Sequence, residues 1–219
     1  MLPESIKLAP RITRVDVNAV AEVKRQSDQP SALPWTLLSG WLPAETADQW
    51  RILLNERLAW QQPVVQVYGR RHPVPRLTVF IGAEGLQYRY SGTQHRAEGW
   101  PPWFTPLLTS VREACGSEFN GCLLNLYRHG EDRMGWHADD EPEIDQHQPI
   151  ASLSLGATRD FCLRHRHDQQ RRTTLPLADG DLLVMHPGCQ QEWMHGVPIR
   201  RRIATPRINL TFRCFLKAT

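Results

Sequence analysis

Polar and apolar side chains alternate along Pro206-Arg207-Ile208-Asn209-Leu210-Thr211-Phe212-Arg213. Successive side chains of a β-strand point to opposite faces, so a strand here would separate the polar residues from the apolar ones. The apolar face suits a core, whereas the arginines of the other face need carboxylate partners or a ligand. The stretch predicts a strand whose polar face looks into a pocket, with Arg207, Asn209, Thr211 and Arg213 on that face.

Other segments also have the composition of short strands, with β-branched and aromatic residues between turn-forming residues. They are residues 64–68, 76–80, 86–90, 122–127, 150–155, 161–164 and 181–186, and the terminal strand extends over residues 207–215. Many strands with few helices predict a mainly β fold. We expect a double-stranded β-helix, or jelly roll, with helices covering one sheet.

Two helices are expected to form that cover. The first starts at Pro43 and ends before Trp60, with an apolar stripe at Ala47, Trp50, Leu54 and Leu58. In the second, Thr105 can cap the helix, Pro106 fits its first turn and Gly116 can end it.

The chain has 219 residues, of which 41% are hydrophobic and 22% charged, as in an ordinary globular domain. We expect one domain over residues 35–219, preceded by a loosely ordered arm over residues 1–34 that shows no clear periodicity. No stretch resembles a membrane span or a signal peptide, and the five cysteines lack metal-binding spacing. These features predict a cytoplasmic protein (nuclear in a eukaryote), monomeric, with reduced thiols and no membrane partner.

Positive charge is concentrated in the C-terminal third. Residues 150–219 contain eleven Lys or Arg against five Asp or Glu, although the whole chain has a formal net charge of only +3. Arginines cluster at residues 164–167, 171–172 and 200–202. Such clusters can bind the phosphates of a polyanion, or they can be ordinary solvated loops.

Two histidines and one carboxylate form the set that holds a non-haem ferrous iron while leaving coordination positions open. His137 and Asp139 would point the same way from an extended segment, and His195 could complete the set. His186 is an alternative third ligand. By itself a His-x-Asp triplet is weak evidence for a metal site, since the segment can also be an exposed turn after Gly135.

Several segments, in this order along the chain, resemble the AlkB family of iron(II)- and 2-oxoglutarate-dependent dioxygenases. They are Asn125-Leu126-Tyr127, His137-Ala138-Asp139-Asp140-Glu141, Ile150-Ala151-Ser152, residues 156–161, residues 180–183, His195 and the terminal arginine strand. The resemblance covers roughly residues 60 to 215 and is more specific than a single short motif.

The resemblance implies Fe(II) as cofactor, with 2-oxoglutarate and O2 as cosubstrates. Iron would be bound by His137, Asp139 and His195, which with Arg213 form the expected catalytic set. The cosubstrate would be bound by Asn125, Tyr127, Arg207, Asn209 and Arg213. An arginine fork suits each carboxylate, because it can form a bidentate, charge-assisted pair that lysine cannot reproduce.

The resemblance also implies substrate contacts in a nucleotide-recognition hairpin around residues 60–92. Residues 65–76 resemble the hairpin of AlkB homologues that repair duplex DNA, so Tyr68 would be inserted into the base stack. Arg70, Arg71 and Arg76 would contact phosphates or the unpaired base. Without the resemblance, an ordinary hairpin turn is the simpler interpretation.

Residues 86–92 and Glu141 complete the expected substrate site. Tyr90 could stack on the extruded base, Tyr88 and Ser91 lie in the same segment, and Glu141 could accept a hydrogen bond from an exocyclic amino group. Cross-strand packing is an alternative role for Tyr88. The tryptophans are expected to be packing elements, with Trp136 and Trp193 as candidate walls near the metal.

These inferences predict an oxidative demethylase that repairs 1-methyladenine and 3-methylcytosine in methylated DNA, duplex or single-stranded, and releases formaldehyde. The resemblance implies that 2-oxoglutarate is converted to succinate and carbon dioxide. A related dioxygenase acting on RNA or on a protein side chain is the enzymatic alternative. A non-catalytic DNA-binding protein of the same fold is the other alternative, and the intact ligand set argues against it.

Overall fold

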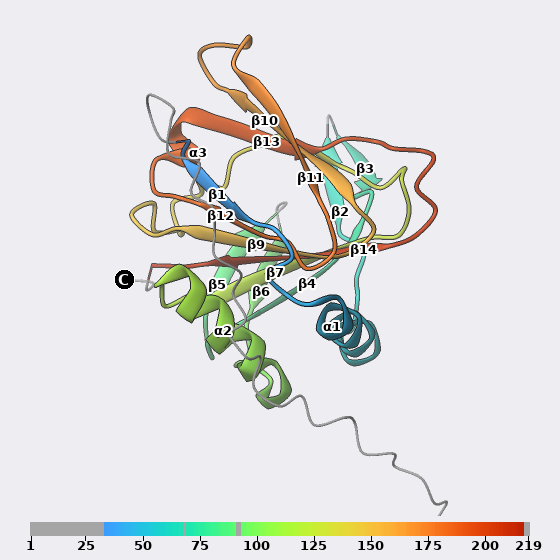
Figure 1. Cartoon of the computed structure of the whole chain (residues 1–219), viewed down its shortest axis with the longest axis vertical. Helices are drawn as coiled ribbons and strands as arrows, with labels where there is room; N and C mark the ends of the chain where they lie inside the picture. The colour runs from blue at the N-terminus through green and yellow to red at the C-terminus, as the bar shows by residue number, and fades with distance from the viewer. Residues whose placement is uncertain (1–32, 68, 91–92, 217–219) are drawn as a thin grey trace, which may run out of the picture.

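Two antiparallel sheets face each other in the computed structural model, which describes residues 33–67, 69–90 and 93–216 (Figure 1). The larger sheet contains, in spatial order, β1 (Trp35–Leu38), β12 (Leu182–Met185), β9 (Ile150–Gly156), β14 (Arg207–Arg213), β7 (Gly121–Tyr127) and β4 (Leu77–Gly82). The smaller sheet contains β11 (Arg172–Leu177), β10 (Arg159–His165), β13 (Trp193–Val197) and β8 (Met134–His137). The expected jelly roll is confirmed.

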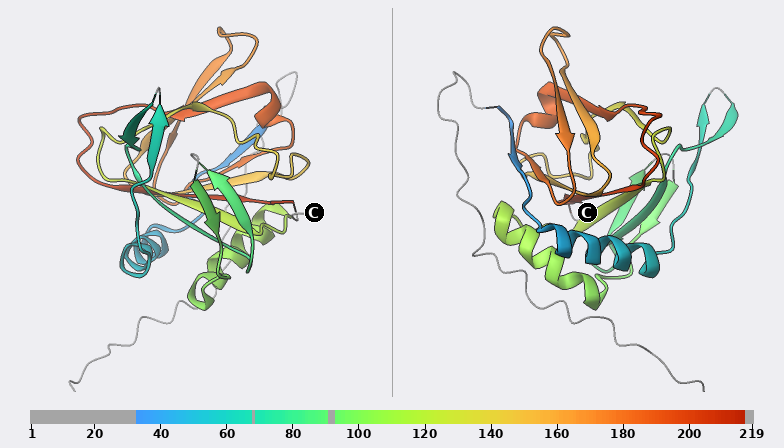
Figure 2. Two further views of the ribbon diagram at one scale, coloured as in Figure 1. Left: turned by 180° about the vertical axis from the view of Figure 1, so that it is seen from behind. Right: turned by 45° about the vertical axis from the view of Figure 1, so that its right-hand side comes forward.

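Two hairpins stand apart from these sheets: β2 (Val64–Val67) with β3 (Arg70–Pro73), and β5 (Gln87–Tyr90) with β6 (Thr93–Arg96). Helices α1 (Ala44–Arg57) and α2 (Thr105–Cys115) lie on the outer face of the larger sheet, as both views of Figure 2 show. A short helix, α3 (Cys189–Glu192), precedes β13, and the 3-10 helix η2 (Pro102–Phe104) leads into α2.

Strand β14 lies in the middle of the larger sheet and separates two hydrophobic cores. Its register places Asn209 opposite Asn125 of β7 and Ser154 of β9. Ile208, Leu210 and Phe212 belong to the core beneath α1 and α2. The polar residues of β14 point the other way, toward the space between the two sheets, as the alternation predicts. A second core, including Leu123, Phe161, Leu163, Leu183 and Trp193, fills part of that space.

The helices follow the predicted apolar stripes. Pro43 precedes α1, and Ala47, Trp50 and Leu54 are buried on its sheet-facing side. Gly116 ends α2 in the left-handed conformation, with φ of 61°, which glycine adopts without steric cost. The expected side-chain cap at Thr105 is wrong, because η2 runs directly into α2 and makes Thr105 its first helical residue.

All eight predicted strands are present, with ends shifted by a few residues. The elements not predicted as strands are β1, β3, β6, β8, β11 and β13, which have short or mixed sequences. Strand β8 ends at His137, so Asp139 lies beyond the strand rather than within it. The two ligands are therefore brought to one side by the chain that follows β8, and not by strand alternation alone.

The arm expected over residues 1–34 falls almost entirely outside the described residues, and the described chain enters β1 at Trp35. Among the described helices, none combines the length and the apolar composition that crossing a membrane requires.

Replacing Trp50 by alanine is expected to lower the free energy of unfolding by about 3 to 5 kcal/mol, because it removes a large side chain from a packed core. Trp50 is fully buried and packs edge-on against Phe104, with ring centroids 6.1 Å apart. Urea denaturation should show a lower midpoint at an unchanged m-value. Ile52→Ala is the control on the same helix, since Ile52 is 51% exposed and its loss should change the unfolding free energy by less than about 0.5 kcal/mol. Equal effects of the two changes would contradict the packing described for α1.

Candidate active site

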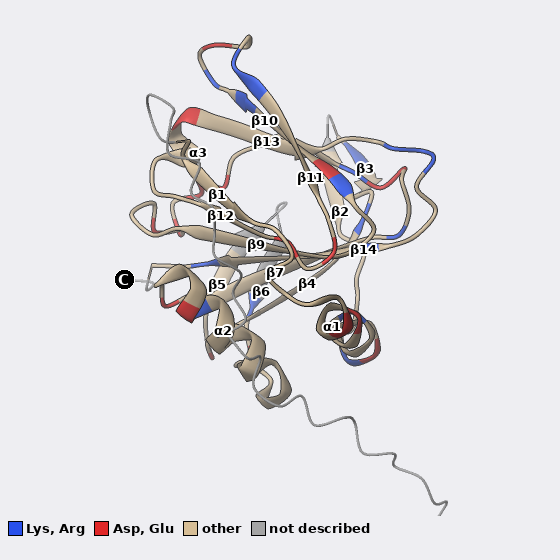
Figure 3. Cartoon of the chain, in the orientation of Figure 1, with Lys and Arg blue, Asp and Glu red and all other residues tan. Residues whose placement is uncertain are grey.

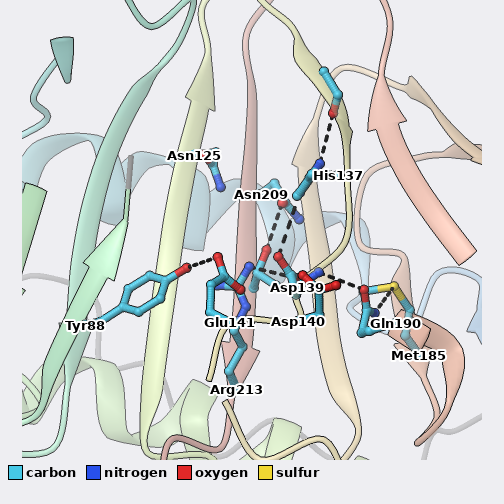
Figure 4. Close-up of polar contacts among 12 residues, drawn as sticks. Tyr88, Asn125, His137, Asp139, Asp140, Glu141, Met185, Gln190, Asn209 and Arg213 are labelled. Atoms are coloured by element: carbon cyan, nitrogen blue, oxygen red, sulfur yellow. Dashed lines mark hydrogen bonds and ion pairs between the residues drawn. The ribbon is translucent and has the colours of Figure 1, made fainter. Parts of the chain in front are cut away.

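A pocket opens between the two sheets, beside the polar face of β14. Strands from both sheets contribute to its wall, which contains Asn125, Tyr127, Met134, His137, Asp139, Ser152, Phe161, Met185, His195, Gly196, Val197, Asn209, Thr211 and Arg213. Figure 4 shows several of these side chains converging from different strands. Arg207 lies on the same face of β14 but beyond this wall, 1% exposed.

His137, Asp139 and His195 meet at this pocket. Their candidate ligand atoms all lie within 4.8 Å of one another, and they form the single such group in the part of the chain that the structure describes. The pairing of β13 with β8 places His195 directly opposite His137. His186, the alternative third ligand, is instead within 2.8 Å of the Thr36 hydroxyl and lies outside this group.

The two imidazoles can each offer a nitrogen lone pair. Nδ1 of His137 lies 2.9 Å from the carbonyl oxygen of Gly135. A proton on Nδ1 would make this a hydrogen bond and leave Nε2 as the metal-binding atom. Burial, together with nearby His137, lowers the pKa of His195 to about 3, so that His195 is neutral near pH 7.

Asp139 is held as a carboxylate. Burial alone would raise its pKa, but Arg213 and the two histidines outweigh that effect and lower the pKa to about 2. Nη2 of Arg213 lies 2.8 Å from Oδ2 of Asp139, and both side chains are 3% exposed. The donor set therefore has two imidazole nitrogens and one anionic oxygen, the combination that suits Fe(II).

Two glutamines that the sequence did not single out hold the peptide groups of Asp139. The backbone N–H of Asp139 donates to Oε1 of Gln190 at 3.0 Å, and Nε2 of Gln146 donates to the carbonyl oxygen of Asp139 at 3.1 Å. Gln190 is buried, and its Nε2 reaches the sulfur of Met185 at 3.3 Å. We call Gln146 and Gln190 the amide clamp. The amide clamp fixes the backbone of Asp139, which lies outside the strands.

An arginine of the β10–β11 loop joins this clamp from outside. Nη2 of Arg166 lies 2.5 Å from Oδ2 of Asp140 and 2.9 Å from the carbonyl oxygen of Gln190. This contact ties the residue after Asp139 to α3. It accounts for one of the arginines in the 164–167 cluster, and it explains why Arg166 is not simply a solvated charge.

Arg207 and Arg213 have more hydrogen-bond donors than the protein satisfies. Nη2 of Arg207 donates to the hydroxyl of Ser154 at 2.6 Å, but Nε and Nη1 of both arginines are buried without a hydrogen-bond partner among the described residues. Unsatisfied buried donors are rare and costly, especially on a charged group. Two carboxylates of one ligand would satisfy both forks, so the residues fit 2-oxoglutarate as well as iron.

The charge state of these arginines supports the same fit. Burial lowers the pKa of Arg207 to about 10, against the raising effect of neighbouring Tyr127, so the guanidinium stays protonated near neutral pH. For Arg213, the attraction of Asp139 outweighs burial, and the pKa is raised. Both groups are therefore permanent cations in a space largely closed to water.

The other expected cosubstrate residues surround the arginines. The ring centroid of Tyr127 lies 5.5 Å from the Cζ atom of Arg207, within cation–π distance. Nδ2 of Asn209 donates to the Ser152 hydroxyl at 2.8 Å and to a backbone carbonyl, so both its protons are used within the sheet. Asn209 can then offer a ligand only its carbonyl oxygen, which already accepts from Thr211 at 3.1 Å.

Arg76 does not lie where the hairpin interpretation placed it. It is 4% exposed, and its Nε donates to Oδ1 of Asn125 at 2.8 Å. Its side chain turns inward just before β4 and is held by the larger sheet in this conformation, and the expected contact with phosphates or the unpaired base stays a prediction. Arg70 and Arg71 of β3 are exposed, as expected.

Tyr88 is fully buried, so its ring cannot stack on a base in this structure. It packs against Phe80 and Phe215 at centroid distances of 5.4 and 4.9 Å, the cross-strand packing considered as the alternative. Its hydroxyl donates to Oε1 of Glu141 at 3.0 Å (Figure 4). Burial, reinforced by Asp139, raises the pKa of Glu141, and its Oε2 is buried without a partner among the described residues.

Tyr68 and Ser91, two other expected substrate residues, lie outside the described residues. For Tyr90 the structure describes the backbone only, at the end of β5 opposite Thr93.

Ser152, Ser154 and Arg159 are additional polar residues at or near the site. Arg159, 1% exposed, donates to the carbonyl oxygens of Asp132 and Pro198 and so holds two loops together.

Arg159 and Ser152 stand in segments that carried the family resemblance, which was the available signal for them. Gln146 and Gln190 lie outside those segments. A glutamine in a loop has no distinguishing pattern, so only the fold reveals the amide clamp.

Comparison with known proteins assigns the family. The model of the 2OG-Fe(II) oxygenase superfamily matches residues 34–213. The mouse (Mus musculus) DNA oxidative demethylase ALKBH2 is 44% identical over 159 residues, which cover 69% of this chain and 66% of that protein. The human (Homo sapiens) alpha-ketoglutarate-dependent dioxygenase alkB homolog 3 is 34% identical over 221 residues, covering 95% of this chain and 74% of that protein.

The chain thus spans just under two thirds of the mouse ALKBH2 length, at 66%. The solved structure of OsALKBH1 has a TM-score of 0.60 at 18% identity and covers 84% of this chain and 100% of its own, which shows a shared fold. The family model, these relatives and the His-Asp-His group agree, and the chain belongs to the AlkB family of dioxygenases that use Fe(II), 2-oxoglutarate and O2.

Proposed function

We propose that this protein is an oxidative demethylase of N-methylated bases, acting on 1-methyladenine and 3-methylcytosine in DNA. The observation that carries the proposal is the pair of buried guanidinium groups, each with unsatisfied donors, beside the His-Asp-His group. This arrangement supports binding of a dicarboxylate and a metal at adjacent positions. ALKBH2 of the mouse is a DNA oxidative demethylase by name, which supports the same activity here.

Iron would be held by Nε2 of His137, a carboxylate oxygen of Asp139 and a ring nitrogen of His195. Iron with 2-oxoglutarate and O2 supplies the oxidising equivalent that hydroxylates a carbon–hydrogen bond. The protein's part is to keep the ligands in place. Arg213 holds one oxygen of Asp139, and the amide clamp holds its backbone on both sides.

The cosubstrate would be oriented by the two arginines of β14. Arg207 would pair with one carboxylate and Arg213 with the other, since both have free N–H groups directed into closed space. Asn125, fixed by Arg76, would complete the polar wall. These residues are already rigid, so binding would cost little ordering of the protein.

The base would enter beside Glu141. Its unpartnered Oε2 is a hydrogen-bond acceptor, and its fixed position through Tyr88 suits the exocyclic amino group of adenine or cytosine. Hydroxylation of the N-methyl carbon consumes one O2 and converts 2-oxoglutarate to succinate and carbon dioxide. The N-hydroxymethyl product then breaks its carbon–nitrogen bond, releasing formaldehyde and the unmodified base.

The charge distribution favours a nucleic-acid substrate over a protein side chain. Basic residues gather at the β10–β11 hairpin, at the loop around residues 200–202 and on β3 (Figure 3). Such arginine clusters can bind the phosphates of a nucleic acid. DNA is preferred over RNA here because the 65–76 segment resembles the duplex-DNA hairpin, and RNA is the second candidate.

Formaldehyde release tests the activity. Purified protein with Fe(II), 2-oxoglutarate, O2 and an oligonucleotide bearing one 1-methyladenine or 3-methylcytosine should release one formaldehyde per base restored. The same sequence should be compared as single-stranded DNA, duplex DNA and RNA. His137→Ala should release none above background. If the His137→Ala variant turned over as fast as wild type, His137 would not be a metal ligand. If the wild-type protein turned over no nucleic acid, the proposed substrate class would be wrong.

Arg207→Lys should raise the KM for 2-oxoglutarate by roughly tenfold to hundredfold with a smaller change in kcat, because a charged hydrogen bond contributes about 1.5 to 3 kcal/mol. Lysine keeps the charge but loses the planar fork. Steady-state kinetics with varied 2-oxoglutarate measures the effect. Arg51→Lys is the control, since Arg51 forms its ion pair with Asp48 on the same helix, α1. An unchanged KM in Arg207→Lys would place the distal carboxylate elsewhere.

Gln190→Leu should weaken metal binding by about tenfold, as loss of a group that orients a metal ligand typically does. Leucine leaves the Asp139 N–H without its acceptor. Mn(II) titration of the metal-free protein measures affinity independently of turnover. Gln191→Leu, an exposed neighbour on α3, should bind Mn(II) as wild type does, and Gln190→Glu, which keeps an acceptor oxygen, should lose less affinity. Equal affinities in Gln190→Leu and Gln191→Leu would disprove the role of the amide clamp.

A further inference from the structure

Trp136 is the one tryptophan of the eight that is exposed, at 43%, while the other seven are buried or partly buried. Trp193, the other candidate wall, is buried against Trp35 with ring centroids 5.0 Å apart. An isolated exposed tryptophan carries a large apolar area in water and is a common feature of binding surfaces. The position of Trp136 shows what it could bind.

Trp136 belongs to the outer face of the smaller sheet. His195 and Phe161 point inward to the pocket, so their neighbours along β13 and β10, Met194 and Arg164, point outward. Arg164 lies opposite Met194 of β13 on one side and opposite Arg172 of β11 on the other. The Cζ atom of Arg164 lies 4.4 Å from the ring centroid of Trp136. One row of side chains therefore crosses the sheet.

This row contains an unfavourable feature that a ligand would relieve. Arg164 and Arg172 stand directly opposite each other on adjacent strands, where like charges repel. Neither forms an ion pair with an acidic side chain of the described chain. Figure 3 shows positive charge along this hairpin. An anion with a flat apolar part could neutralise the two facing cations and stack on the tryptophan.

A nucleotide has that combination, with a phosphate for the arginines and a base for the indole. Trp136 immediately precedes His137, and β8 is the edge strand of its sheet. A nucleic-acid strand whose target base enters the pocket would therefore pass next to Trp136. We infer that Trp136 and Arg164 form a stacking platform for a neighbouring base of the strand that carries the target, with Arg172 on its phosphate. This inference rests on the proposed nucleic-acid substrate.

Stacking predicts a specific pattern of affinities. Trp136→Ala should weaken binding of a labelled, methylated single-stranded DNA by roughly fivefold to hundredfold, the range for loss of one base–aromatic stack. The loss should be smaller for duplex DNA, whose neighbouring bases stay stacked on each other. Trp136→Phe should lose less than Trp136→Ala. Fluorescence anisotropy of metal-free protein gives each Kd.

Salt dependence separates stacking from phosphate contact. Trp136→Ala should lower affinity at every salt concentration without changing the slope of log K against log salt, whereas Arg172→Ala should reduce that slope by about one. Ile52→Ala is the control for losing an exposed apolar side chain, and it should bind as wild type does. Thermal unfolding of each variant shows whether it is folded.

Two results would contradict the proposed stacking platform. If wild-type protein demethylates the oligonucleotide while Trp136→Ala binds it as tightly as wild type does, the platform is wrong and the proposed function stands. If wild-type protein neither binds nor demethylates any methylated oligonucleotide, the proposed function fails and the platform fails with it.

Discussion

Two guanidinium groups buried between two sheets are the constraint on which this structure depends. Arg207 and Arg213 stand on the central strand of the larger sheet, 1% and 3% exposed. A buried cation requires a partner, and breaking such a pair commonly costs several kcal/mol. Asp139 partners Arg213, which commits that carboxylate to one orientation, and the remaining donors have no partner among the described residues. Both arginines therefore have donors that an anionic ligand could satisfy.

Rigidity at this site comes from different sources for different residues. His195 and the arginines are fixed by strand pairing, whereas Asp139 follows the end of β8 and has no strand to hold it. Side chains take the place of strand hydrogen bonds at Asp139. Gln190 and Gln146 bind its peptide groups, and Arg213 binds its carboxylate. Catalytic geometry needs placement within a fraction of an ångström, so these polar contacts matter as much as the ligands themselves.

The same sheets serve two purposes on their two faces. The inner face of the smaller sheet supplies the two histidines of the candidate metal site, and its outer face presents arginines and an exposed indole to solvent. Successive residues on one edge strand, Trp136 and His137, therefore belong to different surfaces. In the proposed function, a metal ligand and a contact to the nucleic-acid strand are therefore adjacent residues of the chain.

Alternation along residues 206–213 predicts, from sequence alone, a strand and the polar face that it turns toward the pocket. A period-two pattern is local, so it can be recognised without knowing which strand pairs with the segment. The family resemblance added the metal ligands. Tertiary structure alone decided that Tyr88 and Arg76 are buried, that β8 stops before Asp139, and that the amide clamp exists. Those outcomes depend on contacts between residues far apart in the chain, where local pattern carries no information and packing selects the arrangement.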